Sequence, residues 1–341
     1  MTLNFEYRSS GNIETDGIMV FVSSDELDSF TSRHALPDDV SSSVELGISS
    51  ELFLGNYNEQ KTFAVPSSKT RMVHISGLGE MKELTPEKLR RICAKAIRSV
   101  MDTKVESLTV LIPNNLPEGI ESGKLITEAL SLGSYQFKKY KTSDSDDSRT
   151  SKINVTIFDP FQVSSKDSIE RGASIARGTN FTRDLGNTAP NDLTPDDLRQ
   201  IAQDLAETSD GKLQFSFFDE EKMSELGMQM FLGVSKGSEV PGRMVFLEYF
   251  PEEAKHTVAL VGKGITFDTG GISLKPGKGM DEMKFDMCGA GAVLGTMKAI
   301  VELGLPINVI GVLAAAENMP DGKAQKPGDI VKTYSGKTVE I

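Results

Sequence analysis

The chain has 341 residues, 38% of them hydrophobic and 25% charged, a composition typical of a soluble protein with two globular domains. No run of about 18 apolar residues occurs and the N-terminus lacks a secretory signal pattern, so no membrane association is expected. The net charge of −12 disfavours nucleic-acid binding, and the two distant cysteines, Cys93 and Cys288, exclude a disulfide framework, so we expect a cytoplasmic protein.

The first half of the sequence predicts alternating strands and helices. Thr85, Pro86 and Glu87 predict the start of a helix, because they suit its N-cap, its first position and the positive end of its dipole. Apolar side chains then recur on one helical face: Leu89, Ile92, Cys93, Ala96, Val100. Short apolar runs predict buried strands at 17–23, 72–77, 108–113 and 152–159.

A polar segment, 142–151, contains no apolar residue and predicts an exposed loop. A strand pattern resumes directly after it, so the loop is expected to lie within the first domain. We place the domain boundary just before a helix that is expected to begin near residue 165. The predicted domains are therefore 1–162 and 163–341.

The second half repeats the α/β pattern. Thr194, Pro195 and Asp197 predict another helix start, with Asp197 at the position of a capping box. A helix is predicted at 289–303 and ends at Gly304. Strands are predicted at 213–218, 244–250, 258–261 and 307–316. The last of them is almost entirely apolar, as is typical of the middle of a parallel sheet, so the fold class is α/β.

The segment 262–290 combines charged residues with many glycines directly after the predicted strand 258–261. It contains Lys263, Asp268, Lys275 and Asp286. In open α/β sheets, ligands bind beyond the carboxyl ends of the strands, and glycine lets the backbone approach a ligand closely. This segment is therefore the predicted active site.

Two aspartates in one crevice repel each other unless a cation lies between them. Divalent ions such as Mn²⁺, Mg²⁺ and Zn²⁺ accept carboxylate oxygens, and two ions about 3.5–4 Å apart lower the pKa of a shared water towards ~7. Beside such ions the Lys263 amine would lose its proton and serve as a nitrogen ligand. Lys275, slightly farther away, would stay charged and stabilise the oxyanion of a tetrahedral intermediate.

The order of these four residues resembles the metal site of the leucyl aminopeptidase family, whose members use two metal ions to remove N-terminal residues from peptides. Four stretches of sequence are similar to the family as well: 264–276, Glu317-Asn-Met-Pro320, Lys326-Pro-Gly-Asp-Ile-Val331 and Arg183-Asp-Leu-Gly-Asn-Thr-Ala-Pro-Asn-Asp-Leu-Thr-Pro195. The resemblance covers the chain from about residue 165 onward. The N-terminal part fits the family's smaller domain in outline only.

The resemblance implies a fold, a site and an activity. The fold would comprise a small N-terminal α/β (macro-like) domain and a larger α/β/α catalytic domain. Lys263, Asp268 and Asp286 would bind two divalent metal ions, Mn²⁺ or Zn²⁺, and Lys275 would be the catalytic residue. The implied substrates are peptides with leucine or another neutral residue at the N-terminus, and the implied assembly is a homohexamer.

One part of the family's pattern does not occur in this sequence. The family's Asn-Thr-Asp-Ala-Glu-Gly-Arg supplies a metal aspartate, a metal glutamate and an arginine that holds a bicarbonate base. This chain ends at Ser335-Gly-Lys-Thr-Val-Glu-Ile341, which is similar to the sequence just before that signature. We therefore expect an incomplete catalytic domain with three of five protein ligands, and little or no activity from the chain as it stands.

Other interpretations of the same residues stay open or are weaker. Asp268-Thr-Gly270 matches the aspartic-protease triplet, but that chemistry needs a second triplet. The glycines of 289–295 resemble a dinucleotide loop, although a glycine-rich start to a packed helix explains them better. An Asp–Lys cluster can be a purely structural salt bridge, and the polypeptide could be a non-catalytic remnant or a scaffold, including a DNA-binding one. Four residues are predicted not to bind metal: His34, His74, His256, Cys288.

Overall fold

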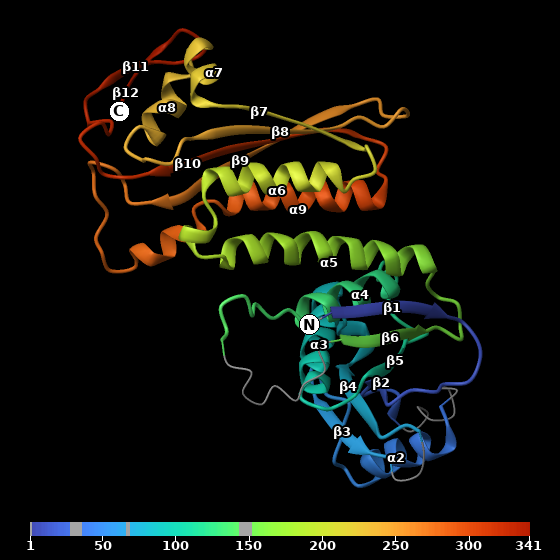
Figure 1. Cartoon of the computed structure of the whole chain (residues 1–341). Coiled ribbons are helices and arrows are strands. Elements are labelled where there is room, and N and C mark those ends of the chain that lie inside the picture. The colour runs from blue at the N-terminus through green and yellow to red at the C-terminus, as the bar shows by residue number, and fades with distance from the viewer. Residues whose placement is uncertain (1, 28–35, 66–68, 143–151) are drawn as a thin grey trace. The chain divides into compact units, whose positions relative to one another are not determined.

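The computed structural model describes residues 2–27, 36–65, 69–142 and 152–341 (Figure 1). Contacts within the chain divide it into two compact units, 1–176 and 177–341. The division falls inside helix α5 (Lys166–Asn187), whereas the expected boundary at 162/163 precedes that helix. Each unit contains a sheet with helices packed on it, so the protein has a two-domain α/β architecture, as predicted.

The first unit is built on a six-stranded sheet of order β1-β6-β5-β2-β4-β3, in which only β3 runs antiparallel to its neighbour. Its strands are β1 (Thr2–Arg8), β2 (Gly17–Ser23), β3 (Gln60–Ala64), β4 (Met72–Gly79), β5 (Ser107–Leu111) and β6 (Lys152–Phe158). Its helices are α2 (Asp38–Ser49), the short η2 (Met81–Glu83), α3 (Pro86–Met101) and α4 (Ser122–Gly133).

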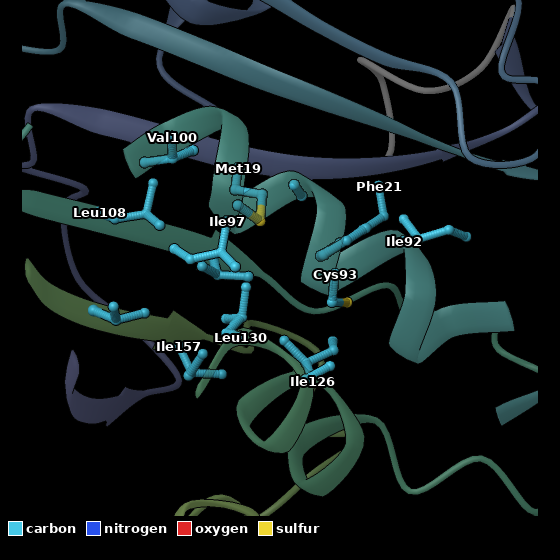
Figure 2. Close-up of a cluster of buried hydrophobic side chains, with 14 of the residues drawn as sticks. Met19, Phe21, Ile92, Cys93, Ile97, Val100, Leu108, Ile126, Leu130 and Ile157 are labelled. Carbon is cyan, nitrogen blue, oxygen red and sulfur yellow. The ribbon is translucent and has the colours of Figure 1, made fainter. Parts of the chain in front are cut away.

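The central strand β2 shows how helices cover both faces of this sheet. The strand is buried along its whole length, as predicted from its apolar sequence. Met19 and Phe21 pack in a cluster with side chains of α3 and α4 (Figure 2). Val20 and Val22 belong to a second cluster that includes side chains of α2. Because successive side chains of a strand point to opposite faces, the sheet lies between α3 and α4 on one side and α2 on the other.

The second unit is built on a four-stranded sheet of order β7-β8-β10-β9, in which β9 and β10 are parallel and the other neighbours are antiparallel. Its strands are β7 (Leu213–Phe218), β8 (Arg243–Tyr249), β9 (Thr257–Asp268) and β10 (Asn308–Asn318), with a separate pair β11 (Ile330–Lys332) and β12 (Thr338–Glu340). Its helices are η3 (Pro190–Asp192), α6 (Pro195–Glu207), α7 (Glu220–Glu225), α8 (Gln229–Ser235), η4 (Met280–Phe285) and α9 (Cys288–Leu303).

Helices α6 and α9 both pack on the second sheet and share one buried cluster with it (Figure 1). Leu198 of α6, Leu247 of β8 and Leu294 of α9 are fully buried in the cluster that joins them. The predicted ends of these helices are confirmed. Thr194 and Asp197 form a capping box at the start of α6, and Gly304 ends α9 in the left-handed conformation with a φ of 60°.

The predicted helix start at Thr85 and the predicted loop at 142–151 can also be compared with the structure. The start of α3 is confirmed, because the Thr85 hydroxyl accepts a hydrogen bond from the Lys88 backbone N–H at 3.2 Å. The sequence pattern gave no sign of β1, β3, α2 or α4. Almost all of the predicted loop at 142–151 lies outside the described residues. Within the described ranges, no helix is both long and apolar enough to cross a membrane.

Candidate metal centre

Strand β9 carries two of the predicted site residues, Lys263 and Asp268. The prediction ended this strand at Val261, which was wrong, because the strand continues through Gly262 to Asp268. Glycine usually weakens strands, so the pattern favoured a loop here. In the structure the glycines allow helix α9 to approach the strand. A Cβ atom on Gly262 would lie 2.5 Å from the backbone oxygen of Gly289.

The same close approach places Asp286 beside Lys263. Asp286 follows η4 and lies just before α9. The Lys263 Nζ lies 2.6 Å from Asp286 Oδ2, and the Lys263 side chain is half-exposed. Despite this short distance, the buried Oδ2 atom accepts no hydrogen bond of regular geometry. The carboxylate therefore has charge compensation from the lysine, but one buried oxygen is left without a directed donor.

Asp268 forms the second pair of the site. The residue is only 8% exposed, and Lys275 Nζ lies 2.5 Å from its Oδ2. Its Oδ1 accepts hydrogen bonds from the Gly270 backbone N–H at 2.9 Å and from Asn318 Nδ2 at 2.7 Å. Burial raises the pKa of Asp268, but the hydrogen bonds from Lys275, Gly270 and Asn318 outweigh it. The pKa lies below its usual value, so Asp268 is ionised at neutral pH.

A tight turn after β9 brings Lys275 back to Asp268. Gly270 and Gly271 have φ values of +87° and +65°, in the left-handed region that favours glycine. The Lys275 backbone N–H donates to the Thr269 carbonyl at 2.9 Å. A Cβ atom on Gly270 would lie 2.4 Å from the Ser273 carbonyl oxygen. The glycine-rich sequence is thus required by the turn that folds the second lysine over the end of the strand.

The four predicted site residues thus form two Lys–Asp ion pairs. Within the described part of the chain, no ion pair or hydrogen bond links one pair to the other. Among the described residues, no group of three or more His, Cys, Asp and Glu side chains could hold a metal ion. The expected ligand set consists of two aspartates and one lysine. It contains only two residues of these four types, so it could not form a group of this kind.

The donor groups fit a divalent cation. Each pair offers a carboxylate whose negative charge is balanced by a lysine ammonium. A metal cation could take the place of that ammonium group beside the carboxylate. Within the described ranges, the buried Oδ2 of Asp286 has no directed donor, and Lys275 is the only partner of Asp268 Oδ2. Both oxygens are therefore suited to bind a cation.

Sequence reasoning missed one residue of the site, Asn318. The sequence Glu317-Asn-Met-Pro320 is similar to the family but does not by itself indicate a role for Asn318. Its amide contacts Asp268, which is 50 residues away in the chain. Only the pairing of β9 with β10 brings these side chains together, so no local pattern indicates the contact.

His74, His256 and Cys288 do not take part in the two ion pairs. His74 is buried in the first unit, with Nδ1 2.8 Å from the Thr62 hydroxyl and Nε2 2.7 Å from Gln60 Oε1. Burial lowers the pKa of His74 to about 4, so it is neutral and structural. Burial raises the pKa of the Cys288 thiol, as does the nearby charge of Asp286. His256 is exposed, and His34 lies outside the described residues.

Family models match both parts of the chain. Residues 180–341 match the catalytic domain of the cytosol aminopeptidase family, and residues 19–144 match the N-terminal domain of the same family. The chain belongs to the cytosol aminopeptidase family. This confirms the resemblance inferred from the order of the site residues. Cytosol aminopeptidases in general depend on divalent metal ions.

Individual relatives agree with this assignment. The cytosol aminopeptidase of Pseudomonas aeruginosa is 41% identical over 284 residues, which cover 82% of this chain and 57% of that protein. A protein of Acinetobacter baumannii named probable cytosol aminopeptidase is 39% identical over 332 residues, covering 96% and 65%. A solved structure of the bottromycin maturation enzyme BotP in complex with Mn has a TM-score of 0.79 and 28% identity, covering 96% and 65%. The chain thus spans about three fifths of the length of these relatives.

Proposed function

We propose that this protein is a metal-dependent aminopeptidase that releases N-terminal residues, preferentially leucine or another neutral residue, from peptides. The observation that carries the proposal is the pair of Lys–Asp contacts at β9, the turn after it and the start of α9, at 2.6 Å and 2.5 Å. Membership of the cytosol aminopeptidase family supports the same reaction class.

Each of the four residues has a role in this proposal. Lys263, Asp268 and Asp286 would hold the metal ions. When bound, divalent ions supply a Lewis acid and an activated water for attack on a peptide carbonyl. Lys275 would keep its ammonium group in the site and donate a hydrogen bond to the oxyanion of the tetrahedral intermediate. The turn at Gly270 and Gly271 would hold Lys275 at that position.

The cofactors, partners and compartment belong to the same proposal. We favour two divalent ions, Mn²⁺ or Zn²⁺, and the solved structure of BotP in complex with Mn supports the first of these. We further propose peptides as substrates, a homohexamer as the assembly and the cytoplasm as the compartment. The net charge of −12 supports the absence of a nucleic-acid partner.

Hydrolysis of leucine amide in the presence of Mn²⁺ tests the proposal. The assay compares this chain with one extended to the length of its relatives through the sequence Asn-Thr-Asp-Ala-Glu-Gly-Arg. Activity in the extended chain alone would support the proposal and show that residues beyond Ile341 complete the site. Activity in both would show that the residues described here suffice. Inactivity of both would refute the proposal and favour a scaffold.

A pair of variants assigns the activity to this site. Asp268→Asn in the active chain is expected to lower the rate at least about 100-fold, because it removes a ligand charge and the partner of Lys275. Asp281→Asn is the matched control, since Asp281 is an exposed acid in η4 close in sequence to Asp286. Equal rates in the two variants would show that the reaction takes place elsewhere.

A further inference from the structure

The two oxygens of the Asp268 carboxylate have different partners. An ionised carboxylate oxygen has about two lone-pair sites. Oδ1 accepts from both the Gly270 N–H and the Asn318 amide, at 2.9 Å and 2.7 Å, so its sites are filled by the protein. Among the described residues, Oδ2 contacts a single partner, the ammonium group at the end of the Lys275 side chain, at 2.5 Å. The second oxygen is therefore the one that can exchange its partner.

An irregularity in the sheet creates the contact between Asn318 and Asp268. In the pairing of β9 with β10, Ala316 lies opposite Ile265, whereas Asn318 lies opposite Asp268. Strand β9 thus contains one extra residue over this stretch, as in a β-bulge. In regular pairing Asn318 would lie opposite Phe267, which faces the other side of the sheet, since side chains alternate along a strand. The bulge therefore brings the amide and the carboxylate together.

The backbone and side chain of Asn318 are both closely confined. The Thr269 backbone N–H and hydroxyl both donate to the Asn318 carbonyl, at 2.9 Å and 2.7 Å. A Cβ atom on Gly271 would lie 2.8 Å from Asn318 Oδ1, so the absence of a side chain at 271 makes room for the amide. Because an ionised carboxylate only accepts hydrogen bonds, the amide must present its NH₂ group to Asp268.

We propose that Asn318 is a positioning residue, which fills Oδ1 of Asp268 and leaves Oδ2 as the single oxygen that binds metal. The inference rests on the proposed metal-binding function and extends it to a residue outside the ligand set. Partners that orient a ligand typically change metal affinity about 10–100-fold when removed. Asn318→Ala would leave Oδ1 with the Gly270 N–H as its partner and open its second site, so that both oxygens could compete for the ion.

Titration calorimetry with Mn²⁺ alone, on the full chain, tests this role. Asn318→Ala is expected to bind Mn²⁺ about 10–100-fold more weakly than the unaltered chain, and Asn318→Ser, which keeps a short donor, is expected to lie between them. The matched control is Thr266→Val. It removes a hydrogen bond from Thr266 to the Ala316 carbonyl of 3.4 Å, between the same two strands, without touching Asp268. The control is expected to bind like the unaltered chain.

Structures of the Mn²⁺-soaked proteins provide a readout that a merely structural role would not change. Asp268 is expected to bind through Oδ2 alone in the unaltered chain and through both oxygens in Asn318→Ala. Equal affinities for the unaltered chain and both Asn318 variants, or an unchanged binding mode, would overturn the role of Asn318 and leave the proposed function intact. The comparison is made in the unaltered chain or, if that does not bind Mn²⁺, in the extended chain. Failure of both to bind Mn²⁺ would instead overturn the proposed metal site, and the inference with it.

Discussion

The contact between β9 and α9 leads to a specific prediction for Gly262→Ala. This glycine lies next to Lys263 in the strand, where the N-terminal turn of α9 crosses it. An added Cβ atom would lie 2.5 Å from the Gly289 oxygen and 2.7 Å from both the Ala290 Cα and the Ala290 N. All three atoms belong to the backbone, so no side-chain rotation can relieve the overlap.

The size of the effect follows from these distances. Carbon atoms pack best at about 3.5–4.0 Å, so the strand and helix would have to separate by roughly 1 Å. Overpacking of this kind costs about 1–3 kcal/mol. The same displacement would move Asp286 away from Lys263, whose charged atoms lie 2.6 Å apart. Gly262→Ala is therefore expected to lower both the free energy of unfolding of the second unit and its affinity for Mn²⁺.

Urea unfolding, followed by circular dichroism and by hydrogen exchange of the α9 amides, measures the loss of stability. Gly277→Ala is the matched control, because an added Cβ atom at Gly277 meets no atom within 4 Å. The control is expected to be neutral or more stable by up to about 1 kcal/mol. If Gly262→Ala unfolded at the same urea concentration as the control, the close packing of β9 on α9 would be wrong.

Three further predictions concern groups outside the metal site. Acidification from about pH 6.5 towards about 4 is expected to lower the free energy of unfolding of the first unit by about 1.4 kcal/mol per pH unit. The reason is that burial lowers the pKa of His74 to about 4, while the unfolded chain takes up this proton near pH 6.5. Thr194→Ala is expected to lower the free energy of unfolding by about 1 kcal/mol, because it removes the N-cap of α6. Thr208→Ala, at the exposed C-terminal end of the same helix, is expected to change it by less than about 0.5 kcal/mol. The Cys93 thiol is fully buried and burial raises its pKa, so alkylating reagents are expected to label it only after unfolding.

Each of these predictions has a direct check. The contribution of neutral His74 to the free energy of unfolding is fully present above about pH 6.5 and is lost on acidification. The dependence of this free energy on pH between about 6.5 and about 4 must therefore disappear in His74→Gln if the buried histidine causes it. Equal losses in Thr194→Ala and Thr208→Ala by thermal unfolding would contradict the capping box. Mass-spectrometric detection of alkylated Cys93 in the native protein would show that the core around α3 opens.

Local sequence was sufficient to predict some helix starts, the buried central strand and the four charged residues of the site. Thr85 and Thr194 marked helix starts, because a capping side chain acts within three residues of its own position. The apolar run of β2 indicated a buried strand, since burial on both faces leaves no polar position. The order Lys263, Asp268, Lys275 and Asp286 was sufficient to indicate the family, because these residues lie within one short segment.

Tertiary structure decided how those residues are paired and which further residue holds them. The glycines of β9 favour a loop when the sequence is taken alone, because the need for glycine arises from α9, which packs on the strand only after folding. Asn318 and Asp268 are 50 residues apart along the chain, and a bulge in the pairing of β9 with β10 brings them into contact. Local preferences cannot fix such a register, because it depends on the contacts of both strands at once.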